Sequence, residues 1–596
     1  MPNRIRSIHT IDETSYPYIF EKNVSVPLKN GGVIRCNVYR PKPSKAGEKF
    51  PVLATYGPYG KDIWYKNFHP LSFKEVNLAH QTEHSAWETP TPEYWTRHGY
   101  VVVRVDEPGT GQSPGLLQAL SGATIDAFAE VIAWASEQEW STGKVGLLGI
   151  SYFAATQWQV AARQPKGLVA AVPWEGFTDL YRDAFRHGGI LSNQFLRSWW
   201  DRQVASNLYG LPGRAARPWG DDTIEGDLSE DELKANTVDL PAVMAKSRYS
   251  DDEYFSSASY NLEDIKIPIL SVANWGGISL HLRGNVQGFI HASSEFKYLR
   301  FIVGRHDLPF YYEEEVEVQR SFLDAFLKGD DRVGWSKKGA VPSVSLLLRK
   351  GDVGYNNPDA EKKLPRRQED EWPIARTQYT KFFFTPDGSL DLTQPELLTS
   401  NKCSYAAPGK GNTSDIITFL TLPFEAETEV TGHIVAHLNV SLSKHHGGSG
   451  PSDIDLFLTL RHLSSNGDEI FYTGTTGEPC PVAKGFLRVS FRKTNLQHPH
   501  HRPWLPYRDY YSTDVLPVIP NEVYAVDVEL WPTNVVVEAG GRLALDISSG
   551  DTAGYGLFGH NDPDDRSDSV FGGSNHLHFG RQFLNYITLP IIPAKE

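Results

Sequence analysis

KVGLLGISYFAATQWQVAA, at Lys144–Ala162, is the most informative segment of this chain of 596 residues. An apolar run that predicts a buried strand ends at Ser151, and a helical pattern begins at the next residue. A serine at such a tight strand-to-helix turn exposes its side-chain oxygen, and the N–H of Tyr152 points toward a developing oxyanion. The segment therefore predicts a nucleophilic Ser151. The alternative is a small buried residue that only lets strand and helix approach.

Similar apolar runs occur on both sides of this segment. Each is short and almost free of polar residues, as in strands of a parallel sheet covered on both faces. Helical patterns such as Thr124–Ser136 and Tyr152–Arg163 alternate with the runs, which predicts a doubly wound α/β sheet. The runs are Pro51–Tyr56, Tyr100–Asp106, Val145–Ile150, Leu168–Trp174, Ile267–Trp275 and Tyr298–Gly304.

The chain is longer than a single domain with one hydrophobic core, so several domains are expected. We predict an α/β core from residues 1–180 and 260–340, interrupted by a helical insertion at 181–259. The insertion is expected to cap the carboxyl edge of the sheet, and the alternative is a peripheral extension. Residues 341–596 alternate as strands of a jelly-roll-like β-sandwich do. Its clearest strand patterns are Ile434–Leu442, Asp453–Leu463, Tyr524–Leu530 and Gly541–Ser548.

Composition argues against several classes of partner. Lys and Arg total 58 against 72 Asp and Glu, a net charge of −14, and no basic run could follow a phosphate backbone. We therefore expect neither nucleic acid nor a membrane as a partner. The N-terminus lacks an apolar leader, and no run of about 18 apolar residues occurs. A cytoplasmic protein is expected, and a homodimer is left open.

No motif implies a cofactor. The three cysteines match no metal spacing or disulfide framework, which fits a reducing compartment. The acidic run Glu313–Gln319 is expected to begin a solvated helix. The histidine-rich segment His498–Arg502 is expected to bind metal only adventitiously. We therefore expect no metal.

Several segments resemble the cocaine-esterase and X-prolyl dipeptidyl-peptidase family (CocE/NonD, S15-like) of α/β-hydrolases. GISYFA is similar to the G-x-S-Y-x-G elbow of that family, although Ala154 replaces the last glycine and Phe153 departs from the general G-x-S-x-G pattern. The resemblance covers nearly the whole chain and implies an α/β-hydrolase core followed by a β-sandwich. The other matching segments are GPYGKD (Gly57–Asp62), VDEPGTGQSPG (Val105–Gly115), PWEGFTDLYRD (Pro173–Asp183), HDLPFYY (His306–Tyr312) and FLDAFLKG (Phe322–Gly329).

The resemblance also implies roles for single residues. Ser151 matches the nucleophile, and Tyr59 matches the tyrosine whose O–H completes the oxyanion hole with the Tyr152 N–H. His306 follows the last strong strand, where the family has its catalytic histidine, and the order Ser before His is that of α/β-hydrolases. His281 is the main rival as base, and His187 a weaker one.

The expected triad acid is missing. The family has an aspartate after the preceding strand, in a Gly-Trp-x-Asp stretch, but this chain has Gly277 at that place. One interpretation is a carboxylate from elsewhere, with Asp252 or Asp307 as candidates. A second is a Ser–His dyad whose ring is oriented by Asn274 or a backbone carbonyl. A third is that hydrolysis has been lost.

The predicted activity is hydrolysis of an ester, rather than an amide or peptide, through a Ser151 acyl-enzyme. The expected partner is a small apolar or aromatic ester, because the insertion carries aromatic side chains that could line a pocket. Packing within the insertion explains these side chains equally well. These aromatics are Phe185, Phe195, Trp199 and Trp200. One rival is a non-hydrolytic enzyme on the same scaffold, which catalyses acyl transfer, cyclisation or elimination on a small metabolite. The other is a binding protein that recognises its ligand through the sandwich.

Overall fold

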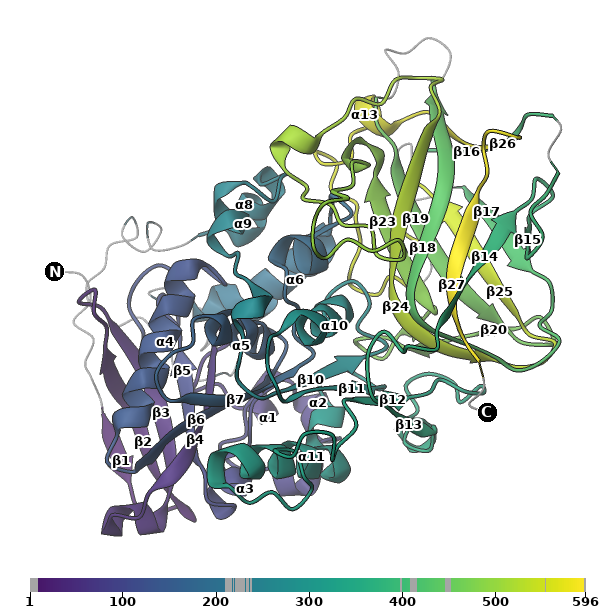
Figure 1. The fold of residues 1–596 in the computed structure, drawn as a ribbon. Helices are drawn as coiled ribbons and strands as arrows, with labels where there is room; N and C mark the ends of the chain where they lie inside the picture. The colour runs from purple at the N-terminus through teal and green to yellow at the C-terminus, as the bar shows by residue number, and fades with distance from the viewer. Residues whose placement is uncertain are drawn as a thin grey trace.

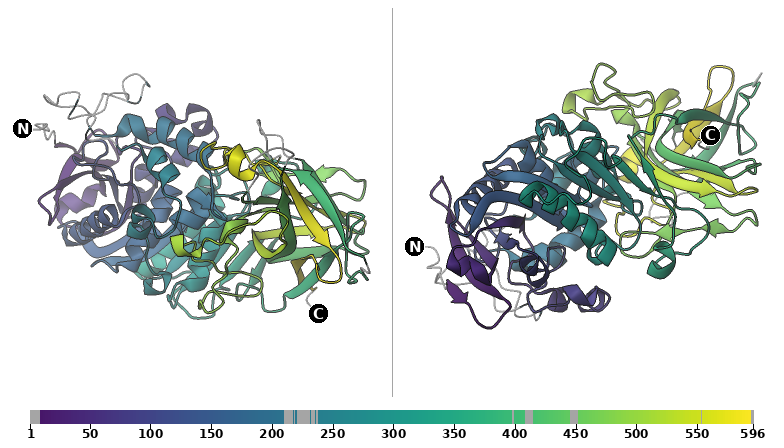
Figure 2. Two further views of the ribbon diagram at one scale, coloured as in Figure 1. Left: turned by 90° about the horizontal axis from the view of Figure 1, so that it is seen from above. Right: turned by 60° about the horizontal axis from the view of Figure 1, so that its bottom comes forward.

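The structure is a computed structural model with two bodies joined along one seam, an α/β core and an all-β domain (Figure 1; Figure 2). It describes residues 9–593 apart from 210–216, 218, 220–230, 232–234, 236–237, 397–398, 408–414, 445–451 and 553. Part of the predicted insertion therefore lies outside the described residues. Within the described residues, no helix is long and apolar enough to cross a membrane.

The core is an 11-stranded sheet in the order β1-β2-β3-β5-β4-β6-β7-β10-β11-β12-β13. Its first three strands are β1 (Thr10–Asp12), β2 (Tyr18–Pro27) and β3 (Val33–Pro41). The strands from β5 to β12 are parallel to their neighbours, and the flanking strands pair antiparallel. All six apolar runs form central strands, so the predicted α/β class is confirmed. They are β4 (Phe50–Gly57), β5 (Val101–Asp106), β6 (Ser141–Ile150), β7 (Leu168–Trp174), β10 (Ile269–Asn274) and β11 (Lys297–Ile302).

Helices cover both faces of this sheet (Figure 1). On one face, α4 (Gly122–Glu137) and α5 (Tyr152–Ala162) bury Phe128 and Trp158 against the strands. On the other face, α3 (Pro92–Arg97) and α11 (Glu313–Leu323) bury Trp95 and Phe322. Because both faces are covered, the central strands need no polar face, which explains their uninterrupted apolar sequence.

The first sheet extends beyond residue 341, where we predicted that the second domain begins. Strand β12 (Val344–Leu347) pairs parallel with β11, and β13 (Arg366–Glu369) closes that edge antiparallel. The second sheet begins only at β14 (Gln378–Phe384). The second sheet therefore begins later in the chain than predicted, because the strands just after residue 341 form the edge of the first sheet.

The insertion is mostly helical where it is described. It contains the short helices α6 (Asn193–Trp199), α8 (Leu240–Lys246) and α9 (Glu253–Ser257), with a two-strand ribbon of β8 (Arg186–His187) and β9 (Ile190–Leu191). Its apolar side chains share one buried cluster with residues around Ser151, including Tyr59, Phe153, Phe185 and Trp199. The insertion therefore lies over the carboxyl edge of the sheet.

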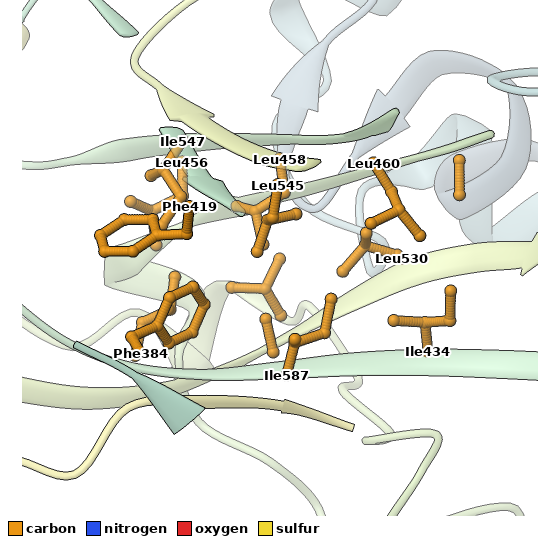
Figure 3. Packing of buried hydrophobic residues seen from close by; sticks show 14 of the residues in the cluster. Phe384, Phe419, Ile434, Leu456, Leu458, Leu460, Leu530, Leu545, Ile547 and Ile587 are labelled. Atoms are coloured by element: carbon orange, nitrogen blue, oxygen red, sulfur yellow. The ribbon is translucent and has the colours of Figure 1, made fainter. Parts of the chain in front are cut away.

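The C-terminal domain is a closed sheet around one core, and its strands pair antiparallel except β15 (Ser389–Asp391), which pairs parallel with β17 (Ile416–Thr421) (Figure 3). The four predicted strands form parts of β18 (Thr428–Ser443), β19 (Asp455–Leu463), β24 (Tyr524–Val537) and β25 (Arg542–Ser548). Strand β27 (Tyr586–Ile592) pairs with both β14 (Gln378–Phe384) and β18. This double pairing closes the sheet, so that side chains such as Phe384, Phe419, Leu458 and Ile587 point inward between two layers.

Buried polar contacts hold the two bodies together. Arg186 of the insertion pairs with Asp565 of the sandwich at 2.8 Å, and both side chains are almost fully buried. Arg283 of α10 (Leu282–His291) pairs with Glu529 at 2.8 Å. The backbone N–H of His306 donates to the carbonyl of Thr475 at 3.0 Å. The sandwich therefore supports the carboxyl edge of the α/β sheet directly.

Candidate active site

Ser151 occupies a strained turn between β6 and α5. Its φ of 61° and ψ of −119° lie in a region that only a few non-glycine residues adopt. Its N–H donates to the carbonyls of Trp174 and Glu175 at 3.0 and 3.1 Å. These contacts fix the turn that was predicted from the sequence, and the hydroxyl is directed away from the strand.

Phe153 stands where the general elbow pattern has its second glycine, and the structure explains why it fits. A Cβ added to Gly57 would lie 2.7 Å from the Phe153 ring, and one added to Gly149 would lie 2.7 Å from the Phe153 Cβ. The ring therefore occupies space that these two glycines leave free. Tyr59 packs against it edge to face, with ring centroids 5.4 Å apart. The departure from the pattern is compensated by packing and places Tyr59 beside the turn.

Tyr59 lies beside Ser151 in the cavity wall, and Tyr152 follows Ser151 in the chain. The Tyr59 hydroxyl accepts a hydrogen bond from the Trp199 indole at 2.9 Å and is also a hydrogen-bond partner of the Ser151 side chain. Burial raises the pKa of Tyr59 well above 10.0, so the phenol stays protonated as a donor. Tyr152 is the first residue of α5, and its N–H has no intrahelical acceptor. A phenol and a backbone N–H beside Ser151 are therefore available as donors.

The Ser151 hydroxyl contacts His281, whose Nε2 lies 3.2 Å from Oγ. The His281 ring stacks on Phe177 on one side and on His306 on the other, with centroid distances of 5.7 and 5.1 Å. Its Nδ1 is buried and has no hydrogen-bond partner among the described residues. Burial, together with the nearby His306, lowers the pKa of His281 well below its ordinary value. This ring is therefore neutral at neutral pH.

His306 is held between two glutamates. Its Nδ1 lies 2.9 Å from Glu175 Oε2, and its Nε2 lies 3.0 Å from Glu88 Oε1. Burial would lower the pKa of His306, but the two carboxylates outweigh burial and raise the pKa well above 6.5. Burial also raises the pKa of Glu88 to about 7, against the effect of His306. The two glutamates therefore favour the charged form of His306.

Glu175 is the carboxylate that contacts Nδ1 of His306. It follows β7, the strand between the nucleophile strand β6 and strand β10. A Cβ added to Gly277 would lie 3.7 Å from Glu175 Oε2, so position 277 borders the Glu175 carboxylate. Asn274 donates to Glu175 Oε1 at 3.2 Å and thereby orients the carboxylate instead of the imidazole. The group that contacts the far nitrogen of His306 is thus a glutamate from the neighbouring strand.

The two acids considered from the sequence lie elsewhere. Asp307 accepts hydrogen bonds from Tyr65 and Ser72 and pairs with Arg305 at 3.1 Å. Asp252 accepts from the Tyr249 N–H in a turn of the insertion. The weaker histidine candidate His187 bonds His560 at 2.8 Å on the sandwich side. None of these side chains supplies the acid or base at Ser151 in this arrangement.

Sequence reasoning missed Glu88 and Glu175 as site residues. Glu175 lies in the quoted segment PWEGFTDLYRD, directly after a central strand, so its position at the carboxyl edge was a usable signal. Glu88 lies in an irregular loop, and its carbonyl accepts from the Ile150 N–H at 3.1 Å. Both residues have positive φ, 63° and 47°. Strained backbone thus occurs at three of the site residues.

A cavity of about 320 Å³ opens above Ser151. The core, the insertion and the sandwich all contribute to its wall, which is largely aromatic near the serine. A much smaller cavity of about 20 Å³ adjoins it at Ser151, and Phe177, Ala184, Phe185 and His281 contribute to the lining of that cavity. Residues lining the larger cavity include Tyr59, Trp87, Phe195, Trp199, His306, Thr475 and Phe558.

Known proteins share this sequence and architecture. Residues 30–306 match the X-Pro dipeptidyl-peptidase (S15 family) model, and residues 337–588 match the X-Pro dipeptidyl-peptidase C-terminal non-catalytic domain. A cocaine esterase from Rhodococcus sp. (strain MB1 Bresler) is 24% identical over 96% of this chain and 99% of its own length.

Solved structures extend the comparison to the fold. A CocE/NonD family hydrolase from Staphylococcus aureus has a TM-score of 0.80 and 25% identity, over 100% of this chain and 98% of its own. An α-amino acid ester hydrolase is similar in fold, with a TM-score of 0.65 and 16% identity over 98% of both chains. Taken with the site geometry, these matches show that this chain is a hydrolase that belongs to the CocE/NonD, S15-like family of α/β-hydrolases.

Proposed function

We propose that this protein hydrolyses a carboxylic ester through a Ser151 acyl-enzyme. The observation that supports this most directly is the position of the Ser151 hydroxyl, which lies between His281 Nε2 and the Tyr59 hydroxyl below an aromatic cavity. A serine hydroxyl needs a neighbouring base to become a nucleophile, and a tetrahedral intermediate needs donors for its oxyanion. Both requirements have candidates within the site.

In the proposed reaction, Ser151 Oγ attacks the carbonyl carbon while its proton passes to a histidine. The carbonyl oxygen becomes an oxyanion that accepts hydrogen bonds from the Tyr59 O–H and the Tyr152 N–H. The intermediate collapses, the C–O bond to the alcohol breaks, and the histidine returns its proton to the departing oxygen. A water molecule then releases the acid by the same steps, and Ser151 is restored.

We assign the proton transfer to His306, with Glu175 as the orienting acid. His281 is closer to the hydroxyl in the resting arrangement, but a proton on this buried ring would have no partner at Nδ1 among the described residues. His306 has Glu175 on its far nitrogen at 2.9 Å, which stabilises an imidazolium. The assignment requires that His306 Nε2 exchanges Glu88 for Ser151 during turnover. His281 is the alternative base.

The charges around the cavity favour an ester over a peptide with a free amino terminus. A peptide amine requires an unpaired carboxylate, but each acid that lines the cavity has a cationic partner. Glu75 and Asp307 both pair with Arg305 at 3.1 Å, and Glu88 bonds His306. Glu88 keeps one buried oxygen, Oε2, without a hydrogen-bond partner among the described residues, but His306 already balances the charge of that carboxylate.

The two cavities also suggest the shape of the substrate. The alcohol must leave first, so it belongs in the larger cavity, which reaches exposed residues such as Leu71 and Arg202. The smaller cavity would then accept the acyl chain. Its volume of about 20 Å³ leaves room for only one or two carbon atoms beyond the carbonyl. We therefore propose short-chain esters of bulky apolar or aromatic alcohols.

The experiment that tests this is the burst of p-nitrophenol from p-nitrophenyl acetate, with the intact protein and with Ser151→Ala. We expect a serine-dependent burst followed by steady turnover. Equal release by both proteins would overturn the proposal. The argument for a non-hydrolytic enzyme came from the glycine at the aspartate position, and the contact of Glu175 with His306 at 2.9 Å supports hydrolysis against it. Product analysis of the same reaction would reveal acyl transfer if it occurs.

A further inference from the structure

A cluster of potential metal ligands lies at the seam between the core and the sandwich, apart from the serine site. It consists of Glu263, His291 and His500, whose ligand atoms all lie within 4.8 Å of one another. Glu263 belongs to the short turn η6 (Leu262–Asp264), and His291 is the last residue of α10. His500 comes from the sandwich domain, within the histidine-rich segment noted in the sequence. The cluster therefore joins three segments that are distant along the chain.

The contacts within the cluster are close. His500 Nε2 lies 2.5 Å from Glu263 Oε1, and the rings of His500 and His291 stack with centroids 3.6 Å apart. The His291 ring is tilted by 22° against that of His500. The side chains of Glu263 and His500 are 48% and 22% exposed, so an ion and its water could reach them from solvent.

His291 is in the state that metal binding requires. Its Nε2 lies 3.2 Å from the Gln287 side-chain oxygen, which can only accept a hydrogen bond. The proton is thereby assigned to Nε2, and Nδ1 keeps its lone pair for a ligand. A histidine held by an outer hydrogen bond is typical of metal sites.

We propose that Glu263, His291 and His500 bind a divalent transition-metal ion of the zinc class, with water as the fourth ligand. Two imidazole nitrogens and one carboxylate oxygen suit such an ion, whereas magnesium and calcium prefer oxygen ligands. Tetrahedral ligands about 2.0–2.2 Å from zinc lie about 3.3 Å apart. The side chains must therefore close by about 1.5 Å at most from their present 4.8 Å limit.

Two cations near the cluster limit the affinity without blocking it. Lys297 donates to the carbonyls of Ile290 and Ala292, and Arg502 donates to the carbonyls of Pro499 and His501. Both head groups are held by backbone oxygens. We therefore expect a micromolar dissociation constant for the ion, which is weaker binding than in a structural zinc finger.

The role that follows is a tether. The loop that carries His500 also carries Tyr507, whose ring contacts the Arg182 guanidinium of the core at 5.0 Å. An ion held by residues from both bodies would fix this loop on α10 and η6. It would bind the folded seam and not the unfolded chain, so it would raise the temperature of unfolding.

The test is calorimetric titration of zinc chloride into the tag-free, chelator-treated full chain. We expect one site per chain, with affinity reduced at least tenfold in Glu263→Gln/His500→Gln. The matched control is His9→Gln, because His9 and Glu21 form a surface pair 3.7 Å apart without a third ligand. Zinc binding that is absent, or equal in the intact and double-variant proteins, would overturn the proposal.

A second readout separates binding from folding defects. Glu263→Gln alone changes a half-exposed side chain, so its unfolding temperature without zinc should equal that of the intact protein. With zinc at about 100 times the dissociation constant, the intact protein should unfold a few degrees higher, and Glu263→Gln should not. Equal zinc-dependent rises in both proteins would contradict the tether. Ester hydrolysis is tested separately by Ser151→Ala, so the two proposals can fail independently.

Discussion

Replacing Glu88 by glutamine should shift the acid limb of hydrolysis to lower pH. In the proposed mechanism His306 must be neutral before it can take the Ser151 proton. Glu88 and Glu175 both stabilise its charged form and raise its pKa well above 6.5. Activity should therefore rise with pH as His306 loses its proton. Glu88→Gln removes one of the two carboxylates, the pKa of His306 falls, and the neutral base is present at lower pH.

The size of the shift follows from the contact between the two side chains. His306 Nε2 and Glu88 Oε1 are 3.0 Å apart and both side chains are buried. A hydrogen bond to a charged group contributes about 1.5–3 kcal/mol, and one pKa unit corresponds to about 1.4 kcal/mol. The acid limb should therefore move down by about one to two pH units. Glutamine can still form a hydrogen bond with His306, so the expected shift of the acid limb lies in the lower half of that range.

The assay is the pH dependence of kcat/KM for a p-nitrophenyl ester, which reports groups of the free enzyme. The matched control is Glu75→Gln, because Glu75 lines the same cavity but pairs with Arg305 instead of His306. We expect the acid limb of the kcat/KM profile to shift to lower pH in Glu88→Gln and to be unchanged in Glu75→Gln. If Glu88→Gln lowers kcat/KM equally at all pH values, Glu88 only supports the loop, and His306 is not the titrating base.

Three other substitutions probe the remaining parts of the site. Tyr59→Phe removes an oxyanion donor and should lower kcat about 10²–10³-fold with little change in KM, measured by steady-state kinetics on the same ester. Glu175→Gln should lower kcat by up to about 10⁴-fold, because His306 loses the acid on its far nitrogen; an intact rate would favour His281 as base. Phe185→Leu should enlarge the small cavity and raise the butyrate-to-acetate ratio of kcat/KM about tenfold, and an unchanged ratio would show that the acyl chain lies elsewhere.

The fold was predictable because its strands are buried on both faces, and such strands are visible as apolar runs. The position of Ser151 followed from the strand-to-helix turn, and that of Tyr59 from the resemblance. The acid that contacts His306 could not be found by spacing along the chain. Glu175 and Gly277 follow different strands and are adjacent only in the folded protein. Only the pairing of β7 with β10 makes them neighbours.

The metal cluster and Glu88 were beyond sequence reasoning for a different reason. His500 was visible in a histidine-rich segment, but Glu263 and His291 carry no local pattern and meet it only across the domain seam. Glu88 lies in a loop without periodicity, so nothing local places it against His306. The contacts of loops are set by tertiary packing, which the order of residues along one segment does not report.

The hydrogen bond from the His306 N–H to the Thr475 carbonyl bears on how such enzymes can be recombined. The domain that contributes Thr475 matches a model named non-catalytic, yet its backbone fixes the loop that carries a proposed proton carrier. Chimeras that exchange this domain between relatives would therefore alter turnover even if every side chain around the serine were retained. Domain exchange would preserve activity only where the turn at 473–479 and the α/β core come from the same parent protein.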